Sequence, residues 1–286
     1  MGQLLINGLT TGMILALPAL ALALSFSILR FADYAIGSYV TLGAFLTWWA
    51  NTAIGLPLWA AAGFGAIATG GVAVLVDLAA YRPLRERGGL TLLVASMGVA
   101  IALENVVRLF AGNSPRAFDV AVARPHRFWG MRVNHEQIVI LAVVVTSLAA
   151  VWLLFRFTRL GRAMRAVADN PSLASVRGIE SGPIVALVWA ISGALAALAG
   201  VLIGLDTSIE TQMGWNYLLP IFTAAILGGI GSPMAAVAGA LVLGLTEEFA
   251  TLFMPPHYRM IVAFAIMALL LMLRPHGLFG AKWVKR

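Results

Sequence analysis

The chain has 286 residues, of which 61% are hydrophobic and only 11% are charged, and its mean hydropathy is +0.93. A soluble domain carries about a quarter charged residues, so this composition excludes a water-soluble globular protein and predicts a single transmembrane domain over residues 1–286. The net charge of +7 does not indicate a nucleic-acid partner, because the arginines collect between apolar runs, and the lack of cysteine excludes disulfides, thiolate metal sites and thiol catalysis.

Nine apolar runs have roughly the length of about 20 residues that a helix needs to cross a bilayer. We therefore predict an all-α integral membrane protein, a polytopic helical bundle of about eight or nine spans. The seventh run is short and rich in glycine, so it is either a span or a re-entrant segment. The first run is too long for the apolar part of a signal peptide and is expected to persist as a span. The expected spans are 4–29, 34–54, 58–79, 90–111, 137–157, 184–205, 216–230, 233–254 and 257–274.

Small residues recur at helical spacing inside these runs. Gly8 and Gly12 are four residues apart, and Gly193, Ala197 and Gly200 share nearly one helix face. Such faces let helices pack closely in lipid, where apolar burial gives little driving force. We interpret them as packing surfaces, with a glycine-lined solute path as the alternative.

Basic residues follow the third, fifth and last runs, and the three clusters fall on one side if every run crosses once. The positive-inside rule makes that side cytoplasmic, with the N-terminus outside and the C-terminus in the cytoplasm. The extracytoplasmic loop at 112–136 opposes the rule because it also carries arginines, although long loops obey the rule less strictly. The clusters are Arg82, Arg85 and Arg87; Arg156, Arg159, Arg162, Arg165 and Arg177; and Arg274, Lys282, Lys285 and Arg286.

A polar module interrupts the apolar chain in the loop at 158–183. Arginines recur at every third position from 159 to 165, and Leu160, Met164 and Val167 form an apolar face. This pattern predicts an amphipathic helix that lies on the membrane surface.

A second, shorter helix follows in the same loop. Asn170 can cap it, Pro171 suits its first position, and Gly178 can end it in the left-handed conformation. Small side chains are expected on its exposed surface, where they suit insertion into a cleft of another protein. From these residues alone the module is either such a docking helix or an ordinary positive-inside loop. The small residues are Ser172, Ala174 and Ser175.

Four segments resemble one family of proteins. "GRAMRAVADNPSLASVRGI" resembles the cytoplasmic signature of bacterial ATP-binding-cassette (ABC) importer permeases of the branched-chain amino-acid type. "INGLTTGMILALPALALALSFSILR" resembles the first span of that family, "AILGGIGSPMAAVAGALVLGLTE" its Gly-Gly-x-Gly-Ser segment, and "LRPHGLFG" its closing segment. The four matches cover most of the chain in the expected order.

The resemblance implies a permease of the bacterial inner membrane that moves a branched-chain or other hydrophobic amino acid by alternating access. The implied partners are two cytoplasmic ATPase subunits, a second, paralogous permease and an extracytoplasmic solute-binding protein. No cofactor is expected on this chain, which lacks a G-x-x-x-x-G-K-[ST] phosphate loop, whereas ATP and Mg²⁺ would be used by the ATPases. The coupling residues implied at the ATPases are Arg162, Arg165, Asp169, Asn170, Ser172, Ala174, Ser175, Arg177 and Gly178.

The chain departs from the family where the second span begins. The family often has an Asn-Phe-Ala-His-Gly-Glu-type segment there, whereas this chain reads "DYAIGSY", with Ile36 in place of the His and Ser38 in place of the Glu. If those polar groups touch the solute, urea, a short amide or an aromatic or short carboxylate becomes the alternative to an amino acid. Asp33, Tyr34 and Ser38 are candidate residues of the translocation path.

Several carboxylates lie inside the runs. Glu104 precedes Arg108 by four residues, so the two can form an ion pair on one helix face, and the alternative is that Glu104 lines the path. Asp77 is expected at a solvated helix end, and Glu247 and Glu248 are expected either at a solvated helix end or in the lining of an entrance.

The glycines around residue 230 form a flexible break. Gly228, Gly229 and Gly231 make either a structural turn or a wall of the path, because freed backbone groups at membrane depth need partners.

No catalytic residue and no metal site is predicted, since the sequence has no H-E-x-x-H motif and no spacing that suggests a Ser-His-Asp triad. Two other functions compete with the importer: an ion-coupled secondary transporter and an intramembrane enzyme. The module at 158–180 favours the importer, because a secondary transporter needs no docking helix for an ATPase.

Overall fold

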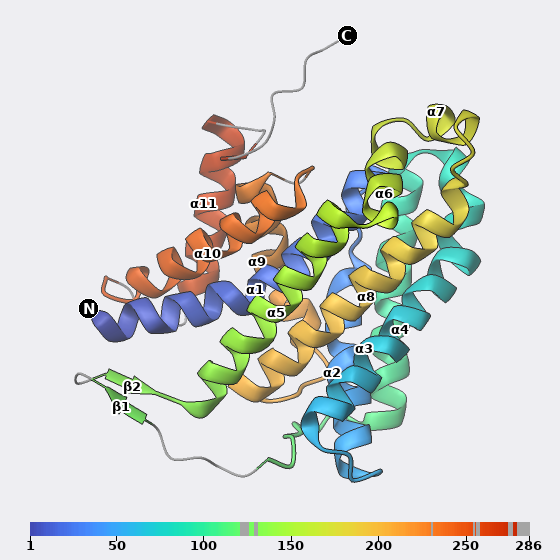
Figure 1. Cartoon of the computed structure of the whole chain (residues 1–286). Coiled ribbons are helices and arrows are strands. Elements are labelled where there is room, and N and C mark those ends of the chain that lie inside the picture. The colour runs from blue at the N-terminus through green and yellow to red at the C-terminus, as the bar shows by residue number, and fades with distance from the viewer. Residues whose placement is uncertain are drawn as a thin grey trace.

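The computed structural model describes residues 1–120, 126–128, 131–229, 231–253, 255, 258–273 and 277–278. Helices make up nearly all of the described chain (Figure 1). They are α1 Gly2–Leu29, α2 Ala35–Thr52, α3 Leu58–Val76, α4 Gly89–Ala111, α5 His135–Phe157, α6 Arg159–Asp169, α7 Pro171–Val176, α8 Ser181–Asp206, α9 Met213–Gly228, α10 Pro233–Ala250 and α11 Arg259–Leu273.

Two features depart from plain α-helix. A π-helical turn, Asp77–Tyr81, and a 3₁₀-helical turn, Arg82–Arg87, continue α3. Two short strands, β1 His126–Phe128 and β2 Met131–Val133, pair antiparallel in the loop before α5. The sequence did not predict this hairpin, because strands of three residues leave no readable alternation.

Six of the described helices are long and apolar enough to cross a membrane: α1, α3 with its continuation, α4, α5, α8 and α10. The other three expected spans coincide with α2, α9 and α11, which have 18, 16 and 15 residues. The prediction of a polytopic helical bundle is confirmed. Of the eight or nine expected spans, six meet the length and composition of a crossing.

Small residues set the closest helix contacts. A methyl group added to Gly200 in α8 would lie 2.0 Å from the Val40 carbonyl oxygen of α2. A methyl group added to Gly244 in α10 would lie 2.2 Å from the Gly12 nitrogen of α1. The backbones therefore touch at these crossings, as the packing interpretation of the glycine pattern predicts.

Both described basic clusters lie at one end of the bundle, which we call the basic end. It includes Arg30 at the end of α1, the 3₁₀ turn after α3, and α6 with α7 (Figure 1). Arg30 Nη2 donates to the Ala168 carbonyl oxygen at 3.1 Å. The turn between α9 and α10 borders α6, and Gly277 packs against Gly229. The third basic cluster, Arg274, Lys282, Lys285 and Arg286, lies outside the described residues.

The described part of the loop at 112–136 lies at the opposite end (Figure 1). Within its described part, Arg116 exchanges two backbone hydrogen bonds with Ile209 in the loop between α8 and α9. The Asn51 side chain at the end of α2 accepts from the Asp119 backbone N–H at 2.8 Å. The two described arginine clusters therefore share an end, and this loop is at the other, which is the arrangement that the span order predicts.

Candidate coupling module and translocation path

The apolar face of α6 lies on the bundle, with one difference from the predicted face. Met164 and Val167 are each 1% exposed, but Leu160 is 46% exposed. Gly161 takes the buried position instead, where a Cβ atom would lie 2.4 Å from the Leu154 carbonyl oxygen of α5. Because α6 approaches the end of α5 closely at Gly161, the side of α6 that carries this glycine faces the bundle, and Leu160 faces outward.

The predicted cap of α7 is present. Asn170 Oδ1 accepts from the Leu173 N–H at 3.1 Å and from the Ser172 hydroxyl at 2.7 Å. Pro171 is the first residue of the helix. Gly178 follows it with φ +79°, a left-handed conformation that glycine adopts without strain.

The expectation that Ala174 is exposed is wrong. Its side chain is 4% exposed and belongs to the apolar core, and its carbonyl oxygen accepts from the Ile179 N–H at 3.0 Å. The outer surface of α7 presents Ser172 and Ser175, which are exposed, together with Leu173 and Val176, which are 59% and 81% exposed. The small side chain lets this short helix lie close to the bundle, and two larger apolar side chains face outward.

Side chains of α1 and α6 anchor the α6–α7 module to the spans. Arg165 Nη1 donates to the Phe155 carbonyl oxygen of α5 at 2.7 Å, and the Arg30–Ala168 hydrogen bond ties α6 to the end of α1. The remaining predicted coupling residues with charge, Arg162, Asp169 and Arg177, are exposed. The module is thus fixed to two spans and open on its outer face.

The glycines near residue 230 form a tight hairpin between α9 and α10. A Cβ atom at Gly228 would lie 2.0 Å from the Ala235 carbonyl oxygen, and Gly229 has φ +128°. These two positions require glycine for packing and backbone conformation, which favours the structural turn. Gly231 has open space beside it, and a cavity of about 380 Å³ separates it from Arg165 and Asp169 of α6.

Asp33 lies in a buried polar and aromatic cluster. It is 0% exposed, and its Oδ1 accepts from the Tyr81 hydroxyl at 3.0 Å and the Ala35 N–H at 2.9 Å. The Tyr81 and Trp189 rings have centroids 5.0 Å apart. Sequence reasoning missed both aromatic residues, because they come from the π-helical turn after α3 and from α8, and only the tertiary structure brings them to Asp33.

Tyr34 and Ser38 lie along the contact of α2 with α4. The Ser38 hydroxyl donates to the Ala100 carbonyl oxygen at 2.9 Å, and the Tyr34 N–H donates to Ser96 Oγ at 3.1 Å. The Tyr34 ring also packs on Phe222 of α9, with centroids 5.1 Å apart. These polar groups hold helices together, and a role in the path stays a prediction.

The Glu104–Arg108 ion pair is present on α4. The Arg108 Nη2 and Glu104 Oε1 atoms are 2.7 Å apart, and the two side chains are 34% and 19% exposed. Glu104 lies one turn beyond Ala100 on α4, so it continues the line of Ser96 and Ala100, the α4 partners of Tyr34 and Ser38. Its predicted role as a path residue is not tested by this geometry.

The other carboxylates are not solvated as expected. Asp77 is 2% exposed and forms an ion pair with Arg85, two turns further along the chain. Glu247 and Glu248 are 6% and 4% exposed, and Glu248 Oε1 accepts from the Asn7 side chain of α1. Because buried carboxylates need partners, Asp77 is held within the helical turns that continue α3, and Glu248 joins α10 to α1.

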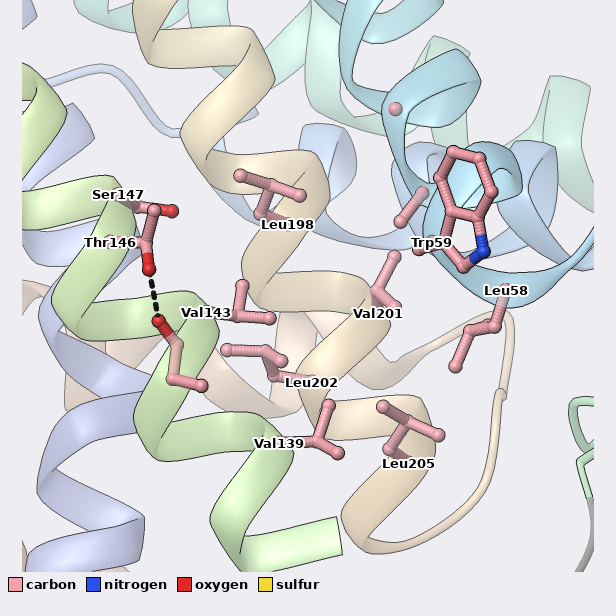
Figure 2. Close-up of a pocket in the computed structure, with 13 residues that line it drawn as sticks. Leu58, Trp59, Val139, Val143, Thr146, Ser147, Leu198, Val201, Leu202 and Leu205 are labelled. Carbon is pink, nitrogen blue, oxygen red and sulfur yellow. Dashed lines mark hydrogen bonds between the residues drawn. The ribbon is translucent and has the colours of Figure 1, made fainter.

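A large apolar cavity opens between α3, α5 and α8 (Figure 2). Its volume is about 610 Å³, and aliphatic side chains such as Val143 and Leu202 dominate its wall. The Thr146 hydroxyl is already bound to the Ala142 carbonyl oxygen at 2.6 Å. Among the described residues, the side chains that line this cavity carry no charge, so its described wall suits hydrocarbon rather than a charged solute.

Fold and site together define a polytopic α-helical membrane protein with an amphipathic module at one end. The chain belongs to the family described as branched-chain amino acid transport system / permease component, whose model matches residues 4–271. The resemblance carried by the four sequence segments is therefore confirmed.

Individual relatives match along nearly the whole chain. It is 33% identical to the high-affinity branched-chain amino acid transport system permease protein BraD of Pseudomonas aeruginosa, over 99% of this chain and 97% of the relative. It is 32% identical to LivH of Escherichia coli, with the same coverage. A probable LivH of Methanocaldococcus jannaschii is 26% identical over 95% of this chain and 90% of the relative.

A solved structure supports the fold. A chain of PsaBC from Streptococcus pneumoniae, solved in complex with Fab, superposes with a TM-score of 0.53. It covers 94% of this chain and 91% of its own length at 12% sequence identity. At this identity the likeness concerns the helical arrangement alone.

Proposed function

We propose that this chain is the permease subunit of an ABC importer that takes up a branched-chain or other hydrophobic amino acid by alternating access. The observation that carries the proposal is the capped, outward-facing α6–α7 module in a chain of this permease family. Two cytoplasmic ATPase subunits dock at the module and use ATP and Mg²⁺. A second, paralogous permease completes the membrane unit, and an extracytoplasmic binding protein delivers the solute.

The basic end faces the cytoplasm in this proposal, as the positive-inside rule requires. The N-terminus lies on the outer side of the bacterial inner membrane, and the C-terminus lies in the cytoplasm. Nine crossings, including α2, α9 and α11, satisfy this orientation within a single domain of residues 1–286. Support comes from the turn between α9 and α10, which borders α6, and from Gly277, which returns to the same end.

Movement of the ATPases reaches the spans through the anchors of the module. Arg165 links it to α5 and Arg30 links it to α1, while the cavity beside Gly231 leaves the α9–α10 turn room to shift. The ATPase surface consists of the predicted polar residues together with Leu173 and Val176. Exposed apolar side chains on a rigid helix are suitable anchors for a groove.

The contact of α2 with α4 is the proposed path. It carries Tyr34, Ser38 and Glu104, and Asp33 lies at its start. The hairpin of Gly228 and Gly229 bounds the path at the basic end.

Transport by the reconstituted complex tests the proposal. Proteoliposomes with this chain, its partner permease, both ATPases and the binding protein should accumulate leucine only when ATP is present. A solute panel that includes urea, short amides and aromatic carboxylates decides between the amino acid and its alternatives. ATP-independent uptake by the permeases alone would identify a secondary transporter and overturn the proposal.

Labelling of single cysteines tests the orientation. The chain has no cysteine of its own, so Ser175→Cys and Asn216→Cys each add a unique thiol at an exposed position. A membrane-impermeant reagent should label Asn216→Cys from outside and Ser175→Cys only in inverted vesicles. Labelling of both from one side would contradict the number of crossings between them.

A further inference from the structure

A polar pocket lies at the end of the bundle opposite to the basic end, between the end of α4 and the loop that joins α8 to α9. Its volume is about 360 Å³, within the range of roughly 300–1,000 Å³ that small-molecule sites occupy. All but one of its lining side chains are polar, in contrast to the cavity of Figure 2. They are Arg108, Asn113, Pro115, Glu210, Thr211 and Gln212.

Two loops are fixed to each other around this pocket. Arg116 and Ile209 exchange backbone hydrogen bonds of 2.9 and 2.8 Å. The Thr211 hydroxyl is 3.4 Å from Asn113 Oδ1, and Thr211 is 6% exposed. The walls of the pocket are therefore formed before any ligand arrives, which lowers the entropy lost on binding.

The pocket contains one cation and one anion from separate segments. Arg108 Nη2 is bound to Glu104, but the Arg108 Nε atom is buried and has no hydrogen-bond partner in the described part of the chain. Glu210 is exposed, and its Oε1 accepts from the Ser208 hydroxyl at 3.1 Å. Arg108 and Glu210 form no ion pair with each other: Glu104 holds the Arg108 cation on one side and the Glu210 carboxylate is exposed, so a ligand with two charges of its own can bridge the two residues.

We propose that this pocket receives the zwitterionic head group of a free α-amino acid, with the carboxylate toward Arg108 and the ammonium group toward Glu210. The choice of solute rests on the proposed function. The pocket would be the first site on the permease after the binding protein releases its solute, because it lies at the end away from the ATPase module and Arg108 pairs with Glu104 of the proposed path.

The pair of charges selects against other solutes. A monoanion would face Glu210 without a compensating ammonium group, and a monocation would face Arg108. Urea carries no charge, so it can hydrogen-bond to both groups but gains neither ion pair. The partial exposure of both side chains keeps binding weak, as a site on a transport path requires, since the solute must also leave.

Direct binding to the permease complex tests the pocket. Right-side-out vesicles with both permeases and both ATPases, without the binding protein, would be titrated with leucine, isocaproate and isoamylamine by saturation-transfer NMR. Isocaproate lacks the ammonium group of leucine and isoamylamine lacks its carboxylate. We expect leucine to bind about tenfold more tightly than either analogue, since each loses a charge-assisted hydrogen bond.

Two pocket variants test which residue binds the ammonium group of the ligand and which binds its carboxylate. Glu210→Gln should remove the advantage of leucine over isocaproate, because the amide no longer attracts the ammonium group. Arg108→Lys keeps the charge beside Glu104 but lacks the Nε–H, and should reduce the advantage over isoamylamine. Asp119→Asn is the matched control, since it removes a charge from an exposed position at the same end but outside the pocket, and it should leave all three affinities unchanged.

Equal binding of the three probes, no leucine binding, or the same loss in Asp119→Asn as in Glu210→Gln would overturn the pocket proposal. If ATP-driven leucine uptake is intact while vesicle binding shows no selectivity, the pocket fails and the proposed function stands. If selective binding is present but the complete complex does not transport leucine, the proposed function fails and the pocket stands.

Discussion

The inner helices α1 and α8 and the outer helices α4 and α5 are similarly apolar but differ in burial. The most apolar segments of α1 and α8 have mean hydropathies of 2.2 and 2.3 and are 72% and 67% buried. Those of α4 and α5 have mean hydropathies of 1.9 and 2.8 and are only 22% and 17% buried. The most hydrophobic of the four helices is thus the least buried.

The difference shows what places a helix inside a membrane bundle. Lipid solvates a large apolar side chain as well as protein does, so hydropathy gives no preference for the centre. Small residues do give one, because they allow backbones to touch and dispersion contacts to accumulate. Gly200 of α8 touches α2, whereas Gly98 of α4 has open space around it.

The largest expected effect is that of one methyl group added to the inner helix α8, and the same change on the outer helix α4 is its control. Gly200→Ala forces α8 away from α2, since the new carbon would lie 2.0 Å from the Val40 carbonyl oxygen. We expect the free energy of unfolding to fall by at least about 3 kcal/mol, together with a large loss of yield. Thermal unfolding in detergent measures the change.

Gly98→Ala is the control on the outer helix. Alanine has higher helix propensity, so this variant should be equally stable or more stable by up to about 1 kcal/mol. Comparable destabilisation by the two variants would contradict the assignment of inner and outer helices.

A smaller effect on stability is expected for α7, where an exposed residue and a buried residue of one short helix can be compared. Val176→Glu changes an exposed side chain, so the protein should accumulate normally but lose ATPase docking, with stimulated ATPase activity reduced about tenfold or more. Ala174→Glu places a charge where the side chain is 4% exposed, so the module itself should be destabilised by about 2 kcal/mol. Substrate-stimulated ATPase activity and protease sensitivity of the module separate the two outcomes.

The control for this pair is Val176→Leu, which keeps an apolar surface and should retain activity. Normal stimulated activity in Val176→Glu would show that α7 does not contact the ATPase.

The smallest effect is expected for the ion pair on the outer helix α4. Glu104→Gln leaves Arg108 without its partner, but because both side chains are partly exposed, the loss of stability should be about 1 kcal/mol. The double variant Glu104→Gln/Arg108→Met should recover the yield of the unchanged protein. If the single variant is fully stable but transports nothing, Glu104 acts in the path and the pair is not mainly structural.

Local features of the structure could be predicted from the sequence because their causes are local. The cap at Asn170, the glycine end at Gly178 and the ion pair at Glu104 each depend on residues within four positions. The partners of buried groups could not be predicted in this way. Asp77 binds Arg85, eight residues away, and Glu248 binds Asn7 at the other end of the chain.

The sequence by itself determined that the chain lies in a membrane, where its basic residues gather, which family it belongs to and where its module begins and ends. The membrane location, the basic clusters and the bounds of the module follow from composition and short-range spacing, whereas the family follows from the resemblance of four longer segments. Only the tertiary structure decided that α1 and α8 are central, that Ala174 points inward, and that Arg108 and Glu210 share a pocket. The physical reason is that an apolar helix in lipid can face any direction at similar free energy, so its orientation is set by contacts with segments distant in sequence.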